Sequence, residues 1–276
     1  MSNSITFLGT GTSTGVPMIG CTCSVCSSSD SKDKRLRSSA YIEYEGFKIL
    51  IDCGPDFRQQ ALSIGLNDLD AILLTHQHKD HTGGLDDVRA LNYLCQGATP
   101  IYCEERVLKG LQQEYAYAFE DEPYPGSPKF DIHIIDEKPF VLSKSFVDST
   151  GKPFVRTIEI IPVRVWHAAL PILAFRIGTL CYLTDASRIE DSEFEKLKGL
   201  DIFTVNSVRR VPHRSHFSLP DALAVIKRVG AKKSFVTHLS HQMADDAKGI
   251  AGTHEVLAKE FPEGVFPAYD GLRVEF

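Results

Sequence analysis

The sequence predicts an α/β protein in which helices cover the outer faces of β-sheets. Short apolar runs typical of strands alternate with segments of helical periodicity, both as strand pairs and as strand–helix units. Gly46 and the Gly178–Thr179 pair each stand between two apolar runs, where hairpin turns are expected. No linker or internal repeat interrupts the rest of the chain, so residues 1–276 are expected to form a single compact domain.

The expected elements are short and evenly distributed. Strands are expected at 5–8, 40–44, 47–52, 71–75, 158–165, 173–177, 180–184, 202–205, 234–237 and 272–276. Helices are expected at 57–64, 86–94, 104–116, 190–196, 220–229 and 244–259. Residues 120–151 contain four prolines and show weak periodicity, which indicates an insertion that could overhang a site.

Composition and charge narrow the class of partner. The formal net charge is −6 and the pI is about 5.9, whereas a protein that grips duplex nucleic acid normally carries a basic excess. The one basic run, 32–37, is short and interrupted, as in a solvated loop. Residues 1–20 lack the apolar core of a signal peptide, and no long apolar run follows. We therefore expect a cytoplasmic protein with neither nucleic acid nor a membrane as its partner.

Four residues with metal-ligand side chains follow the apolar run 71–74: His76, His78, Asp80 and His81. At the end of a strand, residues two apart point the same way, so His76 and His78 can reach one point. Asp80 and His81 follow where two glycines allow a tight turn, and they can face a second point nearby. Imidazoles and a carboxylate are ligands that a divalent transition metal takes. Solvated turn histidines are the alternative, but chance gives this pattern on the order of once per thousand chains.

A second cluster lies near the start of the chain, where Cys21, Cys23 and Cys26 fall within six residues. The chain has seven cysteines, an odd number, and such tight spacing suits thiolates on a metal in a reducing compartment better than disulfides. A structural zinc takes four ligands, and the sequence offers His241 as the fourth, three residues after His238. Because free cysteines also occur as small buried hydrophobes, the spacing alone leaves that alternative open.

The segment from His76 to His81 resembles the H-x-H-x-D-H signature of the metallo-β-lactamase superfamily. The resemblance implies a four-layer αββα sandwich, and it supplies three further ligands that each follow an apolar run: His167, Asp185 and His238. It assigns one metal to His76, His78 and His167. It assigns the other metal to Asp80, His81 and His238, with Asp185 as the bridge.

Asp52 ends the apolar run 49–51, which resembles a second signature of that superfamily. A carboxylate at this position would not bind metal. It would orient a ligand histidine by accepting the other ring N–H. The alternative is a strand-end aspartate that caps a turn, and the sequence favours the orienting role.

The set of motifs resembles one branch of the superfamily, the phosphoribosyl cyclic phosphodiesterases of the carbon–phosphorus lyase pathway. The matching segments follow one another along most of the chain: 8–12, 15–17, 20–26, 75–81, 237–242 and 270–271. Residues 120–151 are longer than in that family and are the main departure. The pyrroloquinoline-quinone biosynthesis branch shares the cysteine cluster but not the whole set of catalytic ligands, and it ranks second.

The resemblance implies a metal-dependent hydrolase, and a phosphodiesterase on a small cyclic phosphate or nucleotide-derived diester is favoured. Asp80 and His216 are its expected catalytic residues. Asp80 helps to hold a dinuclear centre whose hydroxide attacks phosphorus, and His216 gives a proton to the leaving oxygen. His216 matches a family histidine before a helix that Ser218 and Pro220 can start. The alternative is a surface residue at the helix entrance, with His213 as the substitute acid.

Other functions of this fold stay open: a thioester or lactam hydrolase, an accessory protein of pyrroloquinoline-quinone biosynthesis, or a tRNA 3′-end endonuclease, which the acidic composition disfavours. The active-site metals are expected to be zinc or manganese, beside one structural zinc. Arg209 and Arg210 could hold a phosphate but equally suit the surface. The sequence leaves open the physiological substrate, the role of residues 120–151 and the oligomeric state, a homodimer included.

Overall fold

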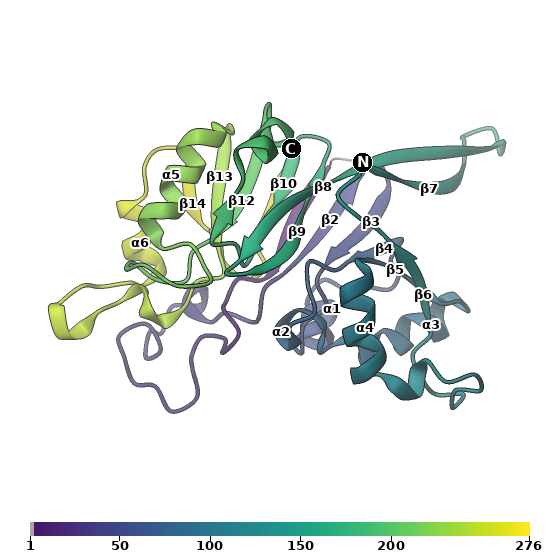
Figure 1. Cartoon of the computed structure of the whole chain (residues 1–276), viewed down its shortest axis with the longest axis horizontal. Helices are drawn as coiled ribbons and strands as arrows, with labels where there is room; N and C mark the ends of the chain where they lie inside the picture. Colours follow the sequence, from purple (N-terminus) through teal and green to yellow (C-terminus); the bar gives the residue numbers. More distant parts are fainter. Residues whose placement is uncertain (1–2) are drawn as a thin grey trace.

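Two β-sheets lie face to face at the centre of the molecule, and helices cover both outer faces (Figure 1). The computed structural model describes residues 3–276. The first sheet has the strand order β15 (Arg273–Glu275), β1 (Ser4–Gly9), β2 (Ser39–Tyr44), β3 (Phe47–Ile51), β4 (Ala71–Leu73), β5 (Thr99–Cys103) and β6 (Phe130–Ile134). The second has the order β11 (Arg188–Ile189), β8 (Pro153–His167), β9 (Leu170–Ile177), β10 (Leu180–Tyr182), β12 (Ile202–Asn206), β13 (Lys233–Thr237) and β14 (Val265–Pro267), with β7 (Phe140–Val147) paired to β8. The expected four-layer αββα sandwich is confirmed.

The helices fall into two groups, one for each sheet (Figure 1). Those beside the first sheet are α1 (Phe57–Ser63), α2 (Lys79–Thr82), α3 (Arg89–Cys95) and α4 (Glu105–Glu114). Those beside the second are α5 (Leu219–Val229) and α6 (His254–Glu260). Ser218 caps the start of α5 with a capping box, and a proline occupies its first turn, as expected. No helix in residues 3–276 is long and apolar enough to cross a membrane.

Three clusters of buried apolar side chains fill the spaces between the four layers. One lies between the sheets and includes Ile49 and Phe175, while the other two lie between each sheet and its helices. β3 shows how one strand serves two clusters. Its residues Ile49 and Ile51 face the other sheet, and Leu50 between them faces the helices. This alternation follows from the two-residue period of a strand, and it is why these strands are apolar on both faces.

The strands that lead to the candidate site end on the same side of their sheets. β3 and β4 are parallel neighbours, as are β10, β12 and β13. β8 is antiparallel to β9, which is antiparallel to β10, so β8 and β10 run in the same direction. The residues that follow these strands therefore gather at one edge of the sandwich, where open α/β sheets usually bind ligands.

Residues 120–151 include one arm of a hairpin that extends away from the candidate site. They contain β6, which extends the first sheet, and β7, which forms a long hairpin with β8 that projects from the body (Figure 1). The tip of this hairpin joins Val147 to Pro153, at the opposite end of the fifteen-residue strand β8 from His167. The ends of such a strand are roughly 45–50 Å apart. The expectation that this segment overhangs the site is therefore wrong for the hairpin.

The expected helix at 244–259 is also wrong over its first half. Two short 3-10 turns, His241–Met243 and Asp246–Lys248, precede α6. Gly249 has a φ of 68°, and a Cβ on Gly252 would lie 2.2 Å from the backbone nitrogen of Ala244. A left-handed glycine and a close backbone approach both end helical geometry. The expected helix at 190–196 is a 3-10 helix, Asp191–Leu197.

Candidate metal centres

Each candidate active-site ligand follows the carboxyl end of a strand. His76, His78, Asp80 and His81 follow β4, His167 ends β8, Asp185 comes shortly after β10, and His238 comes directly after β13. His216 lies two residues before the cap of α5. The structure brings these eight side chains, from both sheets, into one cluster that we call the active-site cluster.

Asp185 lies at the centre of the active-site cluster. Its Oδ2 is 3.3 Å from His81 Nε2, 3.9 Å from His76 Nε2 and 4.0 Å from His216 Nδ1. Its Oδ1 is 3.1 Å from His238 Nδ1. A carboxylate that faces imidazoles on both sides has the position of a ligand shared between two metals.

His78 and Asp80 complete the cluster on either side of Asp185. The ring centroid of His78 lies 4.5 Å from that of His76 and 5.1 Å from that of His167. Asp80 Oδ2 lies 3.4 Å from His81 Nε2. The ligands that the resemblance assigns to two metals thus lie together, but His76 is also close to His81, at a ring-centroid distance of 4.3 Å, so the division of the ligands between two metals stays a prediction.

The buried histidines of the cluster are held by their Nδ1 atoms. His81 Nδ1 lies 2.6 Å from Asp52 Oδ2, and His76 Nδ1 lies 2.9 Å from Thr75 Oγ1, which itself donates to Asp52. His167 Nδ1 lies 2.7 Å from a backbone carbonyl. The Nε2 atoms of His76 and His81 are buried without a hydrogen-bond partner in the described chain. Because buried polar atoms are normally paired, these two nitrogens are suited to binding a metal.

Three residues of this region have a left-handed backbone. Asp52 has a φ of 59°, Asp185 of 60° and His238 of 55°. Non-glycine residues rarely adopt this conformation, which costs of order 1–3 kcal/mol each. All three lie at strand ends, and the conformation turns each side chain toward the cluster. Backbone strain concentrated in this way is typical of a functional site.

The charges of the cluster suit cation binding. Burial lowers the pKa values of His76 and His238, so both imidazoles are neutral. Burial opposes ionisation of Asp185, but His238 and His81 outweigh it and hold its pKa well below the usual range. Burial likewise opposes protonation of His81, but the carboxylates around it raise its pKa well above the usual value. The cluster thus presents ionised carboxylates and neutral imidazoles, with His81 holding the one proton that a metal must displace.

His216 stands at the mouth of the cluster. Its ring centroid lies 4.7 Å from that of His167 and 4.9 Å from that of His238. Burial, reinforced by His238, lowers its pKa to about 3, so it is neutral in the free protein. It is also close enough to His167 and Asp185 to share a metal with them. His213, the substitute acid, lies next to His216 at a centroid distance of 5.0 Å.

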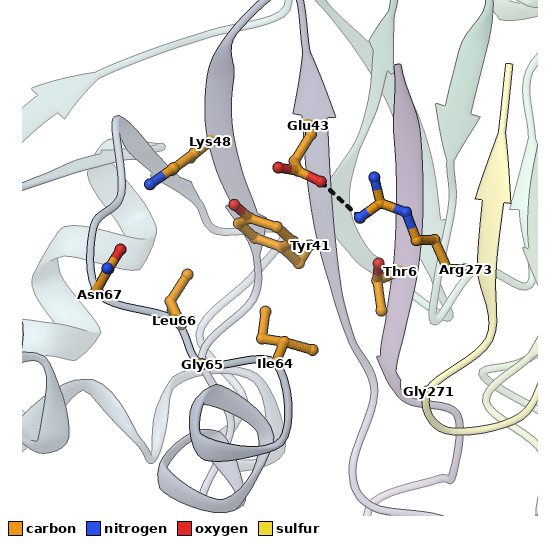
Figure 2. Close-up of a pocket in the computed structure, with 10 residues that line it drawn as sticks. All are labelled: Thr6, Tyr41, Glu43, Lys48, Ile64, Gly65, Leu66, Asn67, Gly271 and Arg273. Atoms are coloured by element: carbon orange, nitrogen blue, oxygen red, sulfur yellow. Dashed lines mark hydrogen bonds and ion pairs between the residues drawn. The ribbon is translucent and has the colours of Figure 1, made fainter. Parts of the chain in front are cut away.

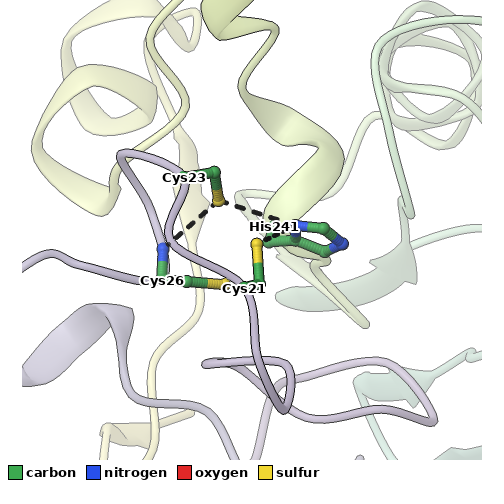
Figure 3. A group of neighbouring side chains, drawn as sticks. All are labelled: Cys21, Cys23, Cys26 and His241. Carbon is green, nitrogen blue, oxygen red and sulfur yellow. Dashed lines mark hydrogen bonds between the residues drawn. The ribbon is translucent and has the colours of Figure 1, made fainter.

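The cysteine cluster meets His241, as the sequence suggested (Figure 3). Cys21 Sγ lies 3.3 Å and Cys23 Sγ 3.5 Å from His241 Nδ1, and all four ligand atoms lie within 4.8 Å of one another. None of the seven cysteines forms a disulfide in the described chain. Three thiol sulfurs and one imidazole nitrogen are a common donor set for a closed structural zinc site. We call this group the Cys3His cluster.

Several functional contacts could not be read from the sequence. Thr75 connects Asp52 to His76. Ser38 Oγ lies 3.0 Å from His238 Nδ1 and donates to the carbonyl of Gly11. A threonine beside the histidine motif was a weak signal for the first contact. No local signal marks Ser38, which lies 200 residues from its partner.

Arg209 and Arg210, whose role the sequence left open, both donate hydrogen bonds within the fold. The Arg209 guanidinium donates to the carbonyls of Val211 and Pro212. Arg210 donates to the carbonyl of Met243 and pairs with Glu260 at 2.6 Å. Arg209 therefore bonds within the loop before α5, and Arg210 joins that loop to Met243 and to the end of α6.

A separate cavity of about 400 Å³ lies against β1, β2 and β3 (Figure 2). No residue of either candidate metal centre lines it. Its charged residues include Glu43 and Arg273, which pair with each other at 2.7 Å. The active-site cluster, not this cavity, carries the groups that chemistry requires.

Comparison with known proteins agrees with the geometry of the cluster. The family model described as "Beta-lactamase superfamily domain" matches residues 48–239, which contain every candidate active-site residue. This protein belongs to the β-lactamase superfamily. Its two sheets and their outer helices are those of the metallo-β-lactamase fold, whose hydrolases use divalent metals.

One solved relative of this superfamily member aligns over the whole chain. The crystal structure of "a New Diphosphatase from the PhnP Family" is 36% identical, with a TM-score of 0.84, and covers 100% of this chain and 98% of its own. This match confirms the resemblance to that branch. The short form of human tRNase Z has a TM-score of 0.67 over 98% of both chains, but at 18% identity it shows the fold alone.

A curated relative from Porphyromonas gingivalis, named octanoyltransferase, is 40% identical over 268 residues. The match covers 96% of this chain but 50% of that protein, so the chain spans half the length of this relative. The part of the chain that the structure describes offers no activated thiol at the active-site cluster. Burial raises the pKa of Cys53, the cysteine beside Asp52, well above the usual value.

Proposed function

We propose that this protein is a metal-dependent phosphodiesterase that acts on a small cyclic phosphate or a nucleotide-derived diester. The observation that carries the proposal is the convergence of seven His and Asp side chains, which could hold two metals, with His216, which faces Asp185 at 4.0 Å. The full-length similarity to a PhnP-family diphosphatase supports phosphorus as the reacting centre. A small substrate is favoured over nucleic acid because the chain carries a net charge of −6.

The residues fit two divalent cations, zinc or manganese. His76, His78 and His167 would hold one cation, Asp80, His81 and His238 the other, and Asp185 both. Cations bound there would supply a nucleophile derived from water and neutralise the phosphoryl oxygens. Asp52 fixes His81 so that Nε2 faces the centre, and Thr75 does the same for His76. The third metal of the chain would be a structural zinc in the Cys3His cluster.

His216 would act on the leaving group. It comes from a loop whose base is closed by the hydrogen bond from Val208 N–H to the Phe217 carbonyl, so its ring is held at the mouth of the cluster. Because its pKa is about 3, His216 is a neutral imidazole until an anion binds beside it. A phosphodiester anion beside the ring favours the imidazolium form, which can donate to the departing alkoxide.

A second phosphorus substrate, a diphosphate linkage, is favoured by the name of the relative that matches the whole chain. Thioester and lactam hydrolysis remain the alternatives outside phosphorus chemistry, and an accessory role in pyrroloquinoline-quinone biosynthesis is the alternative without turnover. Octanoyl transfer is disfavoured, because the chain matches half of that relative and its candidate site is a cluster of metal-ligand side chains.

A substrate panel tests the proposal. The purified protein, loaded with zinc or manganese, is assayed on bis-p-nitrophenyl phosphate, 2′,3′-cyclic nucleotides, a nucleoside diphosphate ester, an acyl thioester and a β-lactam. We expect kcat/KM to be highest on a phosphodiester. Turnover of the thioester or lactam above all phosphorus substrates would reject the phosphodiesterase, and no turnover of any substrate with both metals bound would favour the accessory role.

The role of His216 has its own test. His216→Ala should retain its metals and lose about 10²–10⁴-fold in kcat on a diester with an alkoxide leaving group. It should lose little on bis-p-nitrophenyl phosphate, because nitrophenolate leaves without a proton. Metal content is measured by elemental analysis in the same samples. Equal losses on both substrates would reject the acid role, and lost metal would make His216 a ligand.

A further inference from the structure

A charged network crosses between the two sheets beside the active-site cluster. Its centre is Glu104, the residue before α4, which accepts from two arginines. Arg164 on β8 donates to Glu104 Oε1 at 2.6 Å and to Oε2 at 3.1 Å, and Arg106 on α4 donates to Oε2 at 3.0 Å. Arg164 and Glu104 are only 11% and 17% exposed, so water screens this pair weakly.

One end of the network holds the histidine motif. Arg106 Nη1 donates to Gln77 Oε1 at 2.7 Å, and Gln77 lies between His76 and His78 in the chain. A Cβ on Gly110 would lie 3.0 Å from Gln77 Cβ, so α4 packs directly on this residue. The side chain of Gln77 is therefore fixed by both a charged hydrogen bond and a close helix contact.

The other end holds the strand pair that carries His167. Arg106 Nη2 donates to the carbonyl of Pro171 on β9, and Arg164 lies three residues before His167 on β8. His167 pairs in register with Leu170, next to Pro171. One guanidinium, that of Arg106, thus contacts the His76–His78 segment of the first sheet and the β8–β9 hairpin of the second.

We infer that Arg106 is a positioning residue that sets the distance between His76, His78 and His167, the three ligands of one proposed metal. The inference rests on the proposed function, because it concerns the geometry of that metal. These ligands come from two different sheets, whose shared core is apolar and has no direction, and the nearest backbone link between them is the hydrogen bond from Leu173 N–H to the Thr75 carbonyl at 3.2 Å. The planar guanidinium fork has fixed geometry, so it can align two sheets where an ammonium could not.

The test compares metal binding in variants that retain every proposed ligand. Arg106→Met removes the donors and Gln77→Met removes the acceptor. Gln77→Glu retains an acceptor. Lys109→Met is the matched control, because Lys109 lies on the same helix, is 68% exposed and pairs weakly with Glu105 at 3.9 Å. Metal affinity is measured by competition with a chromophoric chelator for manganese and zinc, and thermal unfolding is measured on the metal-free proteins.

We expect Arg106→Met and Gln77→Met each to weaken one of the two active-site metal affinities by about tenfold, the lower end for residues that orient ligands. The variant with both Met substitutions should bind metal no more weakly than either single variant. Gln77→Glu should bind metal as tightly as the wild type, whereas Arg106→Lys should bind it as weakly as Arg106→Met. Lower thermal stability with unchanged metal affinity in both Met variants would overturn the inference and leave the network a structural one. Absence of active-site metal in the wild-type protein would instead reject the proposed function.

Discussion

The active-site cluster and the Cys3His cluster obtain their ligands in different ways. The active-site ligands follow the ends of β4, β8, β10 and β13, which belong to two sheets. The Cys3His cluster takes three ligands from one six-residue loop and the fourth from another loop. The first cluster is therefore built by the global fold, whereas the second ties two loops together at the surface.

The two clusters also differ in the protein groups that contact their ligand side chains. In the active-site cluster, Asp52 and Thr75 hold ring nitrogens, and strained backbone turns Asp185 and His238 inward. In the Cys3His cluster, Cys21 Sγ and Cys23 Sγ lie 3.3 Å and 3.5 Å from His241 Nδ1, and Cys26 N–H donates to Cys23 Sγ at 3.5 Å, which are long and weak contacts. Hydrogen bonds to the protein thus orient the active-site ligands, whereas the two loops of the Cys3His cluster are joined by the hydrogen bonds from Ser24 to Asp246 and would be joined further by a metal.

One segment connects the two clusters. His238 and His241 lie three residues apart, and Leu239 between them donates to the Thr10 carbonyl and accepts from Thr12 N–H. Ser240 Oγ donates to the Val208 carbonyl, at the base of the loop that carries His216. A metal bound in the Cys3His cluster would thus also constrain one side of the active site.

The largest expected effect comes from removing the shared carboxylate. Asp185→Ala should lower kcat by roughly 10³-fold or more, since metal stabilisation of the transition state is worth several kcal/mol. The Cys3His zinc should remain, because Asp185 takes no part in that cluster. Elemental analysis should show the loss of active-site metal alone. An Asp185→Ala protein with near-normal turnover would show that another carboxylate is shared.

A substitution in the Cys3His cluster is expected to affect turnover less than Asp185→Ala does, and to affect thermal stability more. Cys23→Ser should lower the metal content by one per chain and lower Tm by about 10 °C, because a zinc that joins two loops contributes a few kcal/mol to folding in a chain of this size. Scanning calorimetry and zinc analysis measure both. Asp246, which binds Ser24 in the same loop, offers a control: Asp246→Asn should keep the zinc. Unchanged zinc content in Cys23→Ser would remove this cluster from the metal sites.

The sequence allowed prediction where the signal was local. The histidine motif, the cysteine spacing and the cap of α5 each lie within a few residues, and the fold class follows from the order of strands and helices. Asp185 and His238 were placed by resemblance to a family, since a single aspartate or histidine after an apolar run is not diagnostic.

What could not be predicted depends on distant contacts. β7 pairs with β8 although prolines surround it, because tertiary pairing outweighs local propensity. The bridge from Gln77 through Arg106 to Pro171 spans residues 29 and 65 positions apart, and exposed and bridging arginines look alike in a sequence. Gly252 lies close to the backbone of the chain before it, and residues 244–253 are not part of the helix that periodicity favoured over 244–259.

The smallest expected effect is a difference in pH dependence between the two clusters. Burial raises the pKa of the Cys26 thiol to about 12, so this group is protonated near neutral pH when no metal is bound. Zinc must displace that proton, which alone makes the zinc affinity of the Cys3His cluster fall about tenfold for each pH unit lowered between pH 8 and 6, and any proton displaced from the other two thiols adds to this slope. His76 and His78 are already neutral, since burial lowers both pKa values, so the metal that they hold should show a shallower slope than the Cys3His zinc and than the metal at His81, which must displace the proton of that ring. Chelator competition at three pH values, with Cys23→Ser isolating the active site, measures each slope separately. Equal slopes would mean that the active-site cluster is no better prepared for metal than the Cys3His cluster.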